Sequence, residues 1–352
     1  MKAILLAGGK GTRLRPLTLH TPKPIVPIFD RPFLQYQIDL IRQVPDISEI
    51  VLSLNYQPRR IEDVFGDGSD RGIEIRYVVE PQPLGTGGAI KFAAGAGTDE
   101  PIVVFNGDVL TAVDLPAIVA MHRARRAKAT IVLTPVDNPS AYGLVETDAD
   151  GSVLGFVEKP KPEEIRCNTI NAGIYVLEPD TLARIPADTP YSIERAYFPS
   201  LIENGETFVA HTYEGYWIDI GTPGKYRQVH RDIMSGRFDA APFEGKGGTA
   251  VISPSARIDD GATIEAPCFI DAGVIVKAGA RVGPNSVIGH HSTIGERAVI
   301  DGAILWPSTW VDAEARIGAA LAGRHCHFGR NVEVGDDAVF GDKSQITDYS
   351  KA

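Results

Sequence analysis

The segment Leu6-Ala7-Gly8-Gly9-Lys10-Gly11-Thr12-Arg13 decides how the first part of the chain folds, because a strand ends and a glycine-rich loop begins there. Residues 2–7 form a short apolar run, which predicts a buried strand. The glycines that follow lack a Cβ atom, so their backbone N–H groups can approach a phosphate closely. Four nearby side chains supply positive charge, and these are Lys10, Arg13, Arg15 and Lys23. No acidic residue precedes Asp30, so we expect a ligand with phosphate groups directly after the first strand.

Two common glycine motifs do not fit this loop. It lacks the third glycine of G-x-G-x-x-G and the spacing of G-x-x-x-x-G-K-[ST]. The longer string from Gly8 to Thr18, followed by Thr21-Pro22-Lys23-Pro24, instead resembles the signature of the sugar-nucleotide pyrophosphorylases. These nucleotidyltransferases join a sugar 1-phosphate to a nucleoside triphosphate. The resemblance implies catalytic roles for Arg13 and Lys23, and nucleotide contacts for Leu6, Ala7, Gly8, Gly9, Gly11 and Thr12.

Composition limits the other classes of function. The chain has 352 residues and a net charge of −10, which argues against general affinity for nucleic acid or a membrane surface. No apolar run reaches the roughly 20 residues of a membrane span, and no segment resembles a signal peptide. Three cysteines without metal or disulfide spacing suit a reducing compartment. We therefore expect a cytoplasmic protein.

The order of elements predicts a Rossmann-like α/β fold with a mixed, mostly parallel sheet, in which β-rich runs alternate with helical patterns. A buried strand over residues 101–105 ends in Asn106-Gly107-Asp108. Ligands of such sheets bind beyond the carboxyl ends of the strands, so Asp108 is expected near the phosphates. The alternatives are that Asp108 caps the helix that begins near Asp114 or closes a turn.

A second carboxylate, Asp219, lies in the segment Gly215-Tyr216-Trp217-Ile218-Asp219-Ile220-Gly221. Mg²⁺ prefers one or two carboxylates together with phosphate oxygens. In the family that this chain resembles, two corresponding aspartates hold the metal. The resemblance therefore implies that Asp108 and Asp219 bind Mg²⁺.

The segment from residue 143 to 158 predicts an antiparallel pair of strands with a turn at Asp148-Ala149-Asp150-Gly151. It ends in Phe156-Val157-Glu158-Lys159-Pro160, and Asn171-Ala172-Gly173 follows. The order and spacing resemble the sugar-phosphate pocket of the same family. The resemblance implies that the pocket is formed by Gly143, Glu158, Lys159 and Asn171, with Lys159 at the phosphate.

We expect Glu80 to contact the nucleotide base, and it lies in the string Val79-Glu80-Pro81-Gln82-Pro83-Leu84-Gly85-Thr86. A carboxylate only accepts hydrogen bonds, and guanine presents two adjacent donors, which favours GTP over a pyrimidine nucleotide. Pro83, Gly85 and Thr86 are expected to line the same site. The string resembles mannose- and heptose-1-phosphate guanylyltransferases, and the similarity to the mannose enzymes extends over most of the chain.

We therefore expect GTP and mannose 1-phosphate as substrates and GDP-mannose as the product. The alternatives are a heptose-1-phosphate guanylyltransferase, a glucose-1-phosphate thymidylyl- or uridylyltransferase, and a catalytically silent paralogue that regulates a partner.

The last hundred residues repeat every six positions. Branched residues recur in an unbroken series, which is Ile252, Ile258, Ile264, Ile270, Val276, Val282, Ile288, Ile294 and Ile300. Such a repeat predicts a left-handed parallel β-helix with these residues inside, Trp306 next in step and a register slip from Val311. The expected domains are 1–240 for catalysis, a glycine-rich linker at 241–249, and a β-helix at 250–352 that serves assembly into a homo-oligomer or regulation.

The β-helix raises an alternative function, because hexapeptide-repeat proteins are often acyltransferases with a catalytic histidine. The candidates are His290, His291, His325 and His327, all expected at turns. Solvated turn histidines are the simpler interpretation. His325-Cys326-His327 lacks an evident third metal ligand.

Overall fold

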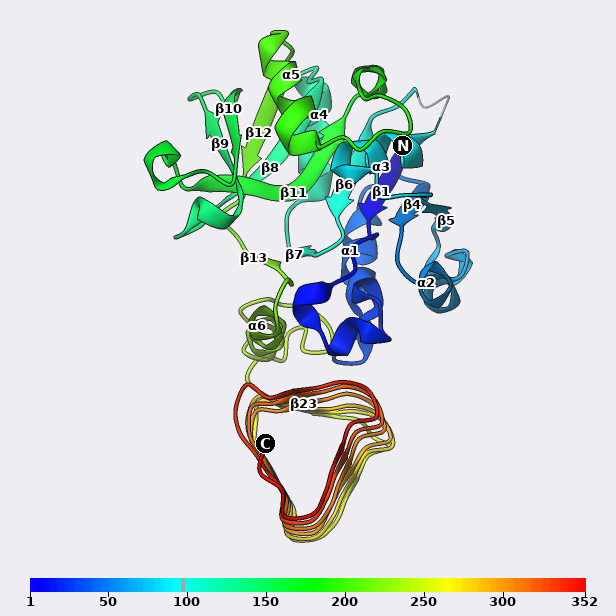
Figure 1. Ribbon diagram of the computed structural model, residues 1–352, viewed down its shortest axis with the longest axis vertical. Coiled ribbons are helices and arrows are strands. Elements are labelled where there is room, and N and C mark those ends of the chain that lie inside the picture. Colours follow the sequence, from blue (N-terminus) through cyan, green and yellow to red (C-terminus); the bar gives the residue numbers. More distant parts are fainter. Residues whose placement is uncertain (96–98) are drawn as a thin grey trace. The chain divides into compact units, whose positions relative to one another are not determined.

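The computed structural model describes residues 1–95 and 99–352 (Figure 1). The chain forms two compact units, each built from two stretches of sequence. The sheet unit contains residues 1–10 and 34–217, and the β-helix unit contains residues 11–33 and 218–352. Residues 11–33 therefore belong to the carboxyl-terminal unit although they follow the first strand directly. The predicted domain limits at 240 and 250 divide the chain differently and stay a prediction.

Four parallel strands form the amino-terminal half of the sheet. Strand β1 (Lys2–Leu6) pairs with β4 (Glu49–Leu54) on one side and with β6 (Ile102–Asn106) on the other. Strand β4 also pairs in parallel with β5 (Glu74–Val79). The run of residues 2–7 is apolar because β1 lies in the middle of the sheet, with Ala3, Ile4 and Leu5 completely buried.

The other half of the sheet is mainly antiparallel and is arranged around β11 (Thr169–Leu177). This strand pairs with β6, with β8 (Ala129–Pro135) and with β9 (Gly143–Thr147). Strands β9 and β10 (Val153–Glu158) form the predicted antiparallel pair, and β12 (Phe208–Thr212) runs parallel to β8. The mixed α/β sheet that the sequence predicts is therefore confirmed.

Helices pack around this sheet (Figure 1). They are α1 (Phe33–Ile41), α2 (Pro58–Phe65), α3 (Gly85–Ala94), α4 (Leu115–Ala124) and α5 (Phe198–Glu203). Helix α3 contacts β1 and β4, and its buried Ile90 and Ala93 belong to the same core as Ile4, Val51 and Val104. Short elements elsewhere in the chain are β2 (Pro27–Ile28), β3 (Arg31–Pro32), β7 (Val109–Thr111) and β13 (Trp217–Asp219).

After helix α6 (Pro223–Met234) the chain forms three parallel sheets of short strands, which appear in Figure 1 as a stack of triangular coils. The first sheet contains β14 (Ala250–Ile252), β17 (Cys268–Ile270), β20 (Ser286–Ile288), β23 (Ile304–Leu305), β26 (Leu321–Ala322) and β29 (Val339–Phe340). The second contains β15 (Arg257–Ile258), β18 (Ile275–Val276), β21 (Thr293–Ile294), β24 (Trp310–Val311), β27 (His327–Phe328) and β30 (Gln345–Ile346). The third contains β16 (Thr263–Ile264), β19 (Arg281–Val282), β22 (Val299–Ile300), β25 (Arg316–Ile317) and β28 (Glu333–Val334). The predicted β-helix is confirmed.

The register of the repeat changes one strand earlier than predicted, at β23 and not at β24. The next branched residue in the β-helix core after Ile300 is Leu305, five positions on, and not Trp306. Val311 and Ile317 then continue the core at six-residue spacing. Trp306 is buried outside this core, against Tyr226 of α6. The prediction that Trp306 stays in step was therefore wrong, because one coil is a residue shorter.

The predicted linker at residues 241–249 is turn-rich but packed. Phe243 is buried, and its ring centroid lies 5.2 Å from that of Phe29 and 6.5 Å from that of Phe269 in the β-helix. Phe29 and Phe269 also contact each other, at 5.3 Å between ring centroids. These three rings join both stretches of the β-helix unit.

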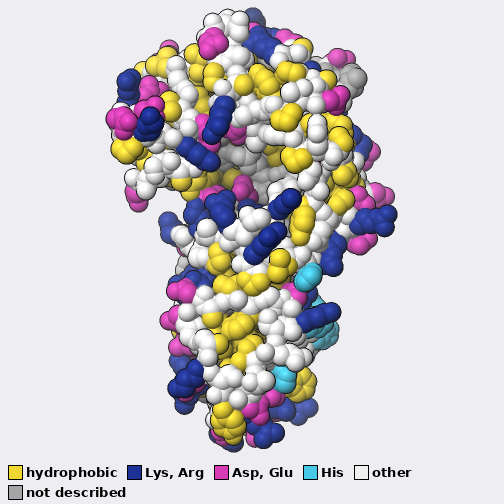
Figure 2. Space-filling model, viewed as in Figure 1, with side chains coloured by type: hydrophobic (Ala, Val, Ile, Leu, Met, Phe, Trp, Pro, Cys, Tyr) yellow, Lys and Arg dark blue, Asp and Glu magenta, His cyan; other side chains and the backbone are white. Residues whose placement is uncertain are grey.

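On the face shown in Figure 2, basic and acidic side chains are interspersed, and apolar side chains occur in small patches. None of the helices in the described part of the chain is both long enough and apolar enough to cross a bilayer.

Candidate active site

The glycine loop follows β1 at the carboxyl edge of the parallel strands. Ala7 donates its N–H to the carbonyl of Ser53 at 2.9 Å, which extends the pairing with β4. A Cβ atom added at Gly8 would lie 3.2 Å from Asn55, so Gly8 allows the loop to pack closely. A Cβ atom added at Gly9 would meet no atom of the described chain within 4 Å. The loop therefore has open space at Gly9, where a ligand could approach the backbone.

A cavity of about 370 Å³ begins at this loop and lies wholly within the sheet unit. Its lining residues are Leu6, Gly8, Gly9, Lys10, Asn55, Glu80, Pro83, Gly85, Thr86 and Ala89. They come from the ends of β1, β4 and β5 and from the first turn of α3. The positive end of the α3 dipole favours an anion, although the N–H groups of Gly87 and Gly88 in its first turn already donate to the carbonyl of Tyr191, at 2.8 and 3.2 Å.

Seven of the ten residues predicted to bind nucleotide share this cavity, namely Leu6, Gly8, Gly9, Glu80, Pro83, Gly85 and Thr86. Ala7 is not in its lining, and Gly11 and Thr12 belong to the β-helix unit. Asn55 and Ala89 were not among the predicted residues. Asn55 directly follows β4, so the same rule about strand ends could have found it.

Glu80 is held in one orientation by two hydrogen bonds. Its Oε1 accepts from Ser53 Oγ at 3.0 Å, and its Oε2 accepts from the N–H of Leu84 at 3.0 Å. Each carboxylate oxygen can accept more than one hydrogen bond, so both retain capacity for a ligand. The arrangement presents a fixed carboxylate at the wall of the cavity.

Hydrogen bonds connect the first turn of α3 with residues 193–194, which precede α5. Thr86 Oγ1 donates to Glu194 at 2.7 Å and accepts from the N–H of Ile193 at 3.0 Å. A Cβ atom at Gly85 would lie 2.9 Å from the carbonyl oxygen of Tyr191, so only glycine permits this approach. Glu194, which the sequence analysis did not assign to the site, thus contacts a residue of the cavity wall.

Asp108 is placed by the glycine before it. Gly107 donates its N–H to the carbonyl of Leu6 at 3.0 Å, and a Cβ atom at Gly107 would lie only 2.4 Å from that oxygen. Asp108 therefore follows a backbone fixed against the end of β1. The alternative role as a helix cap does not hold, because Asp114 caps α4 by accepting from the N–H of Ala117 at 3.0 Å.

The predicted sugar-phosphate residues lie around the ends of β9, β10 and β11. Glu158 pairs with Gly143 across the two strands, and a Cβ atom at Gly143 would lie 2.9 Å from Glu158 Oε2. Burial raises the pKa of the Glu158 carboxyl, and the negative charge of Glu194 raises it further, whereas Lys159 opposes the shift. Glu158 therefore binds a proton more readily than an exposed glutamate does.

Asn171 is oriented by its neighbours on β11. Its Oδ1 accepts from the N–H of Gly173 and its Nδ2 donates to the hydroxyl of Tyr175, both at 2.8 Å. Trp217 Nε1 donates to the carbonyl of Ala172 at 2.9 Å, and the Trp217 ring packs edge-on against Tyr142 at 5.8 Å. Tyr142 and Trp217 were not predicted as site residues, because their position depends on tertiary packing.

Arg13, Lys23 and Asp219 all belong to the β-helix unit. A Cβ atom at Gly221 would lie 2.9 Å from Arg13 Nη2, and Gly221 donates its N–H to the carbonyl of Asp219 at 3.0 Å. Arg13 and Asp219 therefore flank one turn. The Asp219 carboxylate forms an ion pair with Lys225, a residue that the sequence analysis did not assign.

Lys23 is buried and lies next to Gly11, which has a left-handed backbone with φ of +59°. A Cβ atom at Gly11 would lie 3.3 Å from Lys23 Cβ and 3.2 Å from Thr18 Cγ2. Thr18 Oγ1 donates to the carbonyl of Gly11 at 2.7 Å. Gly11 is thus needed both for the turn and for its close contact with Lys23.

Within residues 1–95 and 99–352, no three His, Cys, Asp or Glu side chains are grouped to hold one metal ion. The carboxylates of Asp108 and Asp219 are hard oxygen donors of the kind that Mg²⁺ prefers.

Three of the four histidines of the β-helix lie at turns, and one lies on a strand. His327 lies on β27 and not at a turn as expected, and its Nε2 contacts Asp312 Oδ2 at 2.9 Å. His290, His291 and His325 are at turns. Cys326 is buried, and burial raises the pKa of its thiol to about 11, so it is a poor thiolate ligand.

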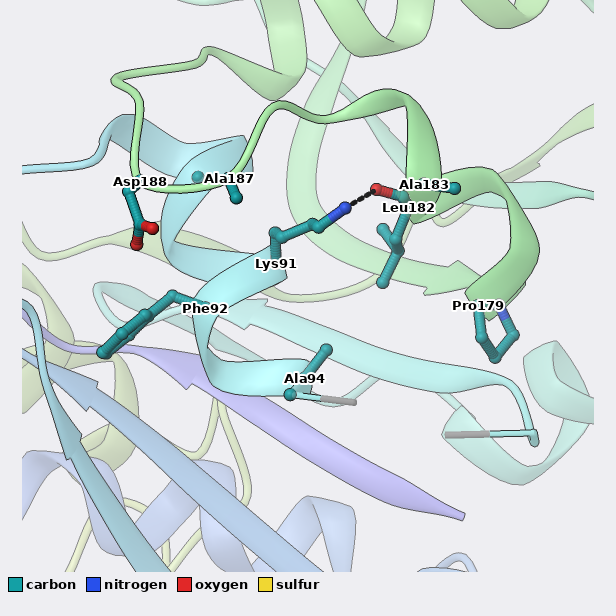
Figure 3. Close-up of a pocket in the computed structure, with 10 residues that line it drawn as sticks. Lys91, Phe92, Ala94, Pro179, Leu182, Ala183, Ala187 and Asp188 are labelled. Carbon is teal, nitrogen blue, oxygen red and sulfur yellow. Dashed lines mark hydrogen bonds between the residues drawn. The ribbon is translucent and has the colours of Figure 1, made fainter. Parts of the chain in front are cut away.

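A second cavity of about 450 Å³ lies along another part of α3 (Figure 3). Its lining residues are Gly88, Lys91, Phe92, Ala94, Gly95, Pro179, Leu182, Ala183, Ala187 and Asp188. Lys91 Nζ donates to the carbonyl of Leu182 at 3.0 Å, as the dashed line in Figure 3 marks. None of the predicted site residues contributes to this cavity, so we place the candidate site at the first one.

The family comparison identifies the class of this protein as a nucleotidyltransferase. Residues 2–236 match the family described as nucleotidyl transferase, and residues 264–350 match the GMPPB C-terminal domain. The chain belongs to the nucleotidyl transferase family. This family is typically metal-dependent and implies a nucleoside triphosphate and a sugar 1-phosphate as substrates.

The chain is similar to a curated enzyme and to two solved structures. Mannose-1-phosphate guanylyltransferase of Mycobacterium tuberculosis is 39% identical over 263 residues, which cover 74% of this chain and 72% of that protein. The structure of HddC from Yersinia pseudotuberculosis with GMP-PN is 30% identical, has a TM-score of 0.54 and covers 66% of this chain and 99% of that one. A Bacillus anthracis structure described as a glucose-1-phosphate thymidylyltransferase is 22% identical, with a TM-score of 0.60 and coverage of 65% and 94%. This last likeness shows the fold alone.

We predict that Gly9→Ala weakens nucleotide binding without destabilising the protein. The added methyl group meets no atom of the described chain within 4 Å, but it occupies the space through which a phosphate would reach the loop. The KM for the nucleotide should rise at least about tenfold, which corresponds to about 1.4 kcal/mol, with the melting temperature unchanged. An unchanged KM would contradict the assignment of this loop to the phosphates.

We also predict that Glu194→Gln shifts the acidic limb of the pH profile to lower pH. The resemblance assigns Glu158 to the sugar, and its carboxylate accepts from hydroxyls more strongly than the protonated acid does, so kcat/KM for the sugar phosphate should fall as pH decreases through its raised pKa. Removing the charge of Glu194 removes part of that increase. The ionisation of the sugar phosphate itself is the same for both enzymes and cancels. Glu203→Gln, an exposed change on α5, is the control, and equal profiles for all three enzymes would refute the prediction.

Proposed function

We propose that this nucleotidyltransferase transfers GMP from GTP to mannose 1-phosphate and forms GDP-mannose. The observation that carries the choice of base is the Glu80 carboxylate, which Ser53 and Leu84 orient at the wall of the glycine-loop cavity. Two carboxylate oxygens match the adjacent N1–H and N2–H₂ donors of guanine. The mannose-1-phosphate guanylyltransferase relative and the GMP-PN complex of HddC support the same base.

The reaction needs no covalent intermediate with the enzyme. A phosphate oxygen of the sugar 1-phosphate attacks the α-phosphorus of GTP in line with the bond that breaks, and pyrophosphate leaves with that electron pair. The nucleophile is already an anion, so the protein has to align the reactants and compensate charge. The backbone N–H groups after β1 would bind the triphosphate, while Arg13 and Lys23 would compensate the charge that develops on the α-phosphate and pyrophosphate.

In the proposed enzyme Asp108 and Asp219 would hold Mg²⁺, which would neutralise phosphate charge when bound. Lys225 now pairs with Asp219, so it would have to share that carboxylate with the ion. Glu158 and Asn171 would bind sugar hydroxyls, Gly143 would leave room for the sugar, and Lys159 would pair with its phosphate. The β-helix would also mediate a homo-oligomer, for which the half-exposed Trp310 is one contact candidate.

The proposal is tested by pyrophosphate release from the four common nucleoside triphosphates and dTTP, each with mannose, glucose and heptose 1-phosphates. Turnover should be highest with GTP and mannose 1-phosphate and should require a divalent cation. Turnover only with dTTP or UTP and glucose 1-phosphate would overturn the base assignment. Binding of nucleotide without turnover of any pair would favour a silent paralogue.

We predict that Glu80→Gln lowers kcat/KM for GTP by about 10- to 100-fold, because an amide offers guanine one acceptor in place of a charged pair. Activity with UTP should fall less, since uracil presents both a donor and an acceptor. The matched control is Glu74→Gln, an exposed change on the same strand β5. Equal losses with GTP and UTP would mean that Glu80 only supports the turn at Leu84.

A further inference from the structure

The segment that carries Arg13 and Lys23 is built onto the β-helix. Residues 11–33 share a compact unit with residues 218–352. A Cβ atom added at Gly341 in the β-helix would lie 3.2 Å from Pro16, and Phe269 of β17 contacts Phe29. The coils therefore pack against both ends of this segment.

Arg324 makes a specific polar contact with the middle of the segment. Its Nη1 donates to Thr21 Oγ1 at 2.7 Å, and Thr21 is completely buried. Arg324 is itself fixed within the β-helix, because its N–H donates to Asp342 at 2.8 Å and its carbonyl accepts from Lys343 at 2.8 Å. Its guanidinium carbon also lies 5.4 Å from the centre of the Trp306 ring, which is a cation–π distance.

Trp306 also begins a series of two hydrogen bonds that leads to Pro27. Trp306 Nε1 donates to the hydroxyl of Tyr226 at 2.9 Å, and that hydroxyl donates to the carbonyl of Pro27. Trp306 and Tyr226 are both buried, so water does not compete for these bonds. Thr21 and Pro27 bracket the single 3₁₀ turn Lys23–Ile25, and both are held from the β-helix side.

We propose that Arg324 is a positioning residue for catalysis, which acts through Thr21 to fix the turn that carries Lys23. The β-helix is then part of the catalytic apparatus and does not serve assembly alone. This inference rests on the proposed role of Lys23. A cation that compensates charge in a transition state is effective only when it is held in place beforehand, and small displacements are costly.

The test compares full-length Arg324→Ala, Thr21→Val and the double variant. Each single variant should lower kcat by about 10- to 100-fold, with the KM values of both substrates changed less than about threefold. The double variant should be no worse than either single one, because both changes remove the same interaction. Thr21→Ser keeps the hydroxyl and should retain activity. Arg297→Ala is the matched control, since Arg297 pairs with Glu314 on the β-helix surface.

Hydrogen exchange gives a readout that does not depend on the reaction. Amides of residues 17–33 should exchange faster in Arg324→Ala and Thr21→Val than in the unmodified protein or in Arg297→Ala. Unchanged exchange, normal kcat in folded Arg324→Ala, or equal loss in Thr21→Ser and Thr21→Val would each overturn the inference. The assays use whichever substrate pair the unmodified enzyme turns over, so a wrong choice of sugar or base does not affect the result. Failure of the unmodified enzyme with every pair would instead remove the proposed function.

Discussion

The close approach of β6 to β1 is the constraint on which the candidate site depends. The two strands run in parallel, and Gly107 lies so near the carbonyl of Leu6 that a Cβ atom would be 2.4 Å from it. The glycine loop and Asp108 therefore leave the sheet at one edge. Buried strands such as β1 and β6 cannot shift register without moving apolar side chains out of the core, so the position of both groups follows from the sheet.

The charged residues of the proposed reaction come from both units. Asp108, Glu158 and Lys159 belong to the sheet unit, whereas Arg13, Lys23 and Asp219 belong to the β-helix unit. The glycine loop and the cations Arg13 and Lys23 are only a few residues apart in the sequence. The chain nevertheless passes from the sheet unit to the β-helix unit between Lys10 and Gly11. The β-helix thus helps to hold Arg13 and Lys23, two residues of the amino-terminal signature, in place.

Much of the fold could be predicted because the decisive signals are local. Apolar runs predicted β1 and β6, and the antiparallel pair β9 and β10 has the predicted bounds. Trp306 was misplaced because an apolar residue at six-residue spacing gives no sign that its coil is one residue shorter. The contacts of Thr21 with Arg324, of Glu194 with Thr86 and of Lys225 with Asp219 could not be predicted, since they depend on tertiary packing. The roles of the predicted site residues still rest on the resemblance.

A crystal structure of the full chain with GDP-mannose and Mg²⁺ tests the central claim most directly. The proposal predicts guanine against Glu80, the pyrophosphate over the backbone of Gly8 and Gly9, and the sugar against Glu158. A nucleotide bound in the other cavity along α3, beside Lys91 and Asp188, would contradict it. So would a base that makes no contact with Glu80.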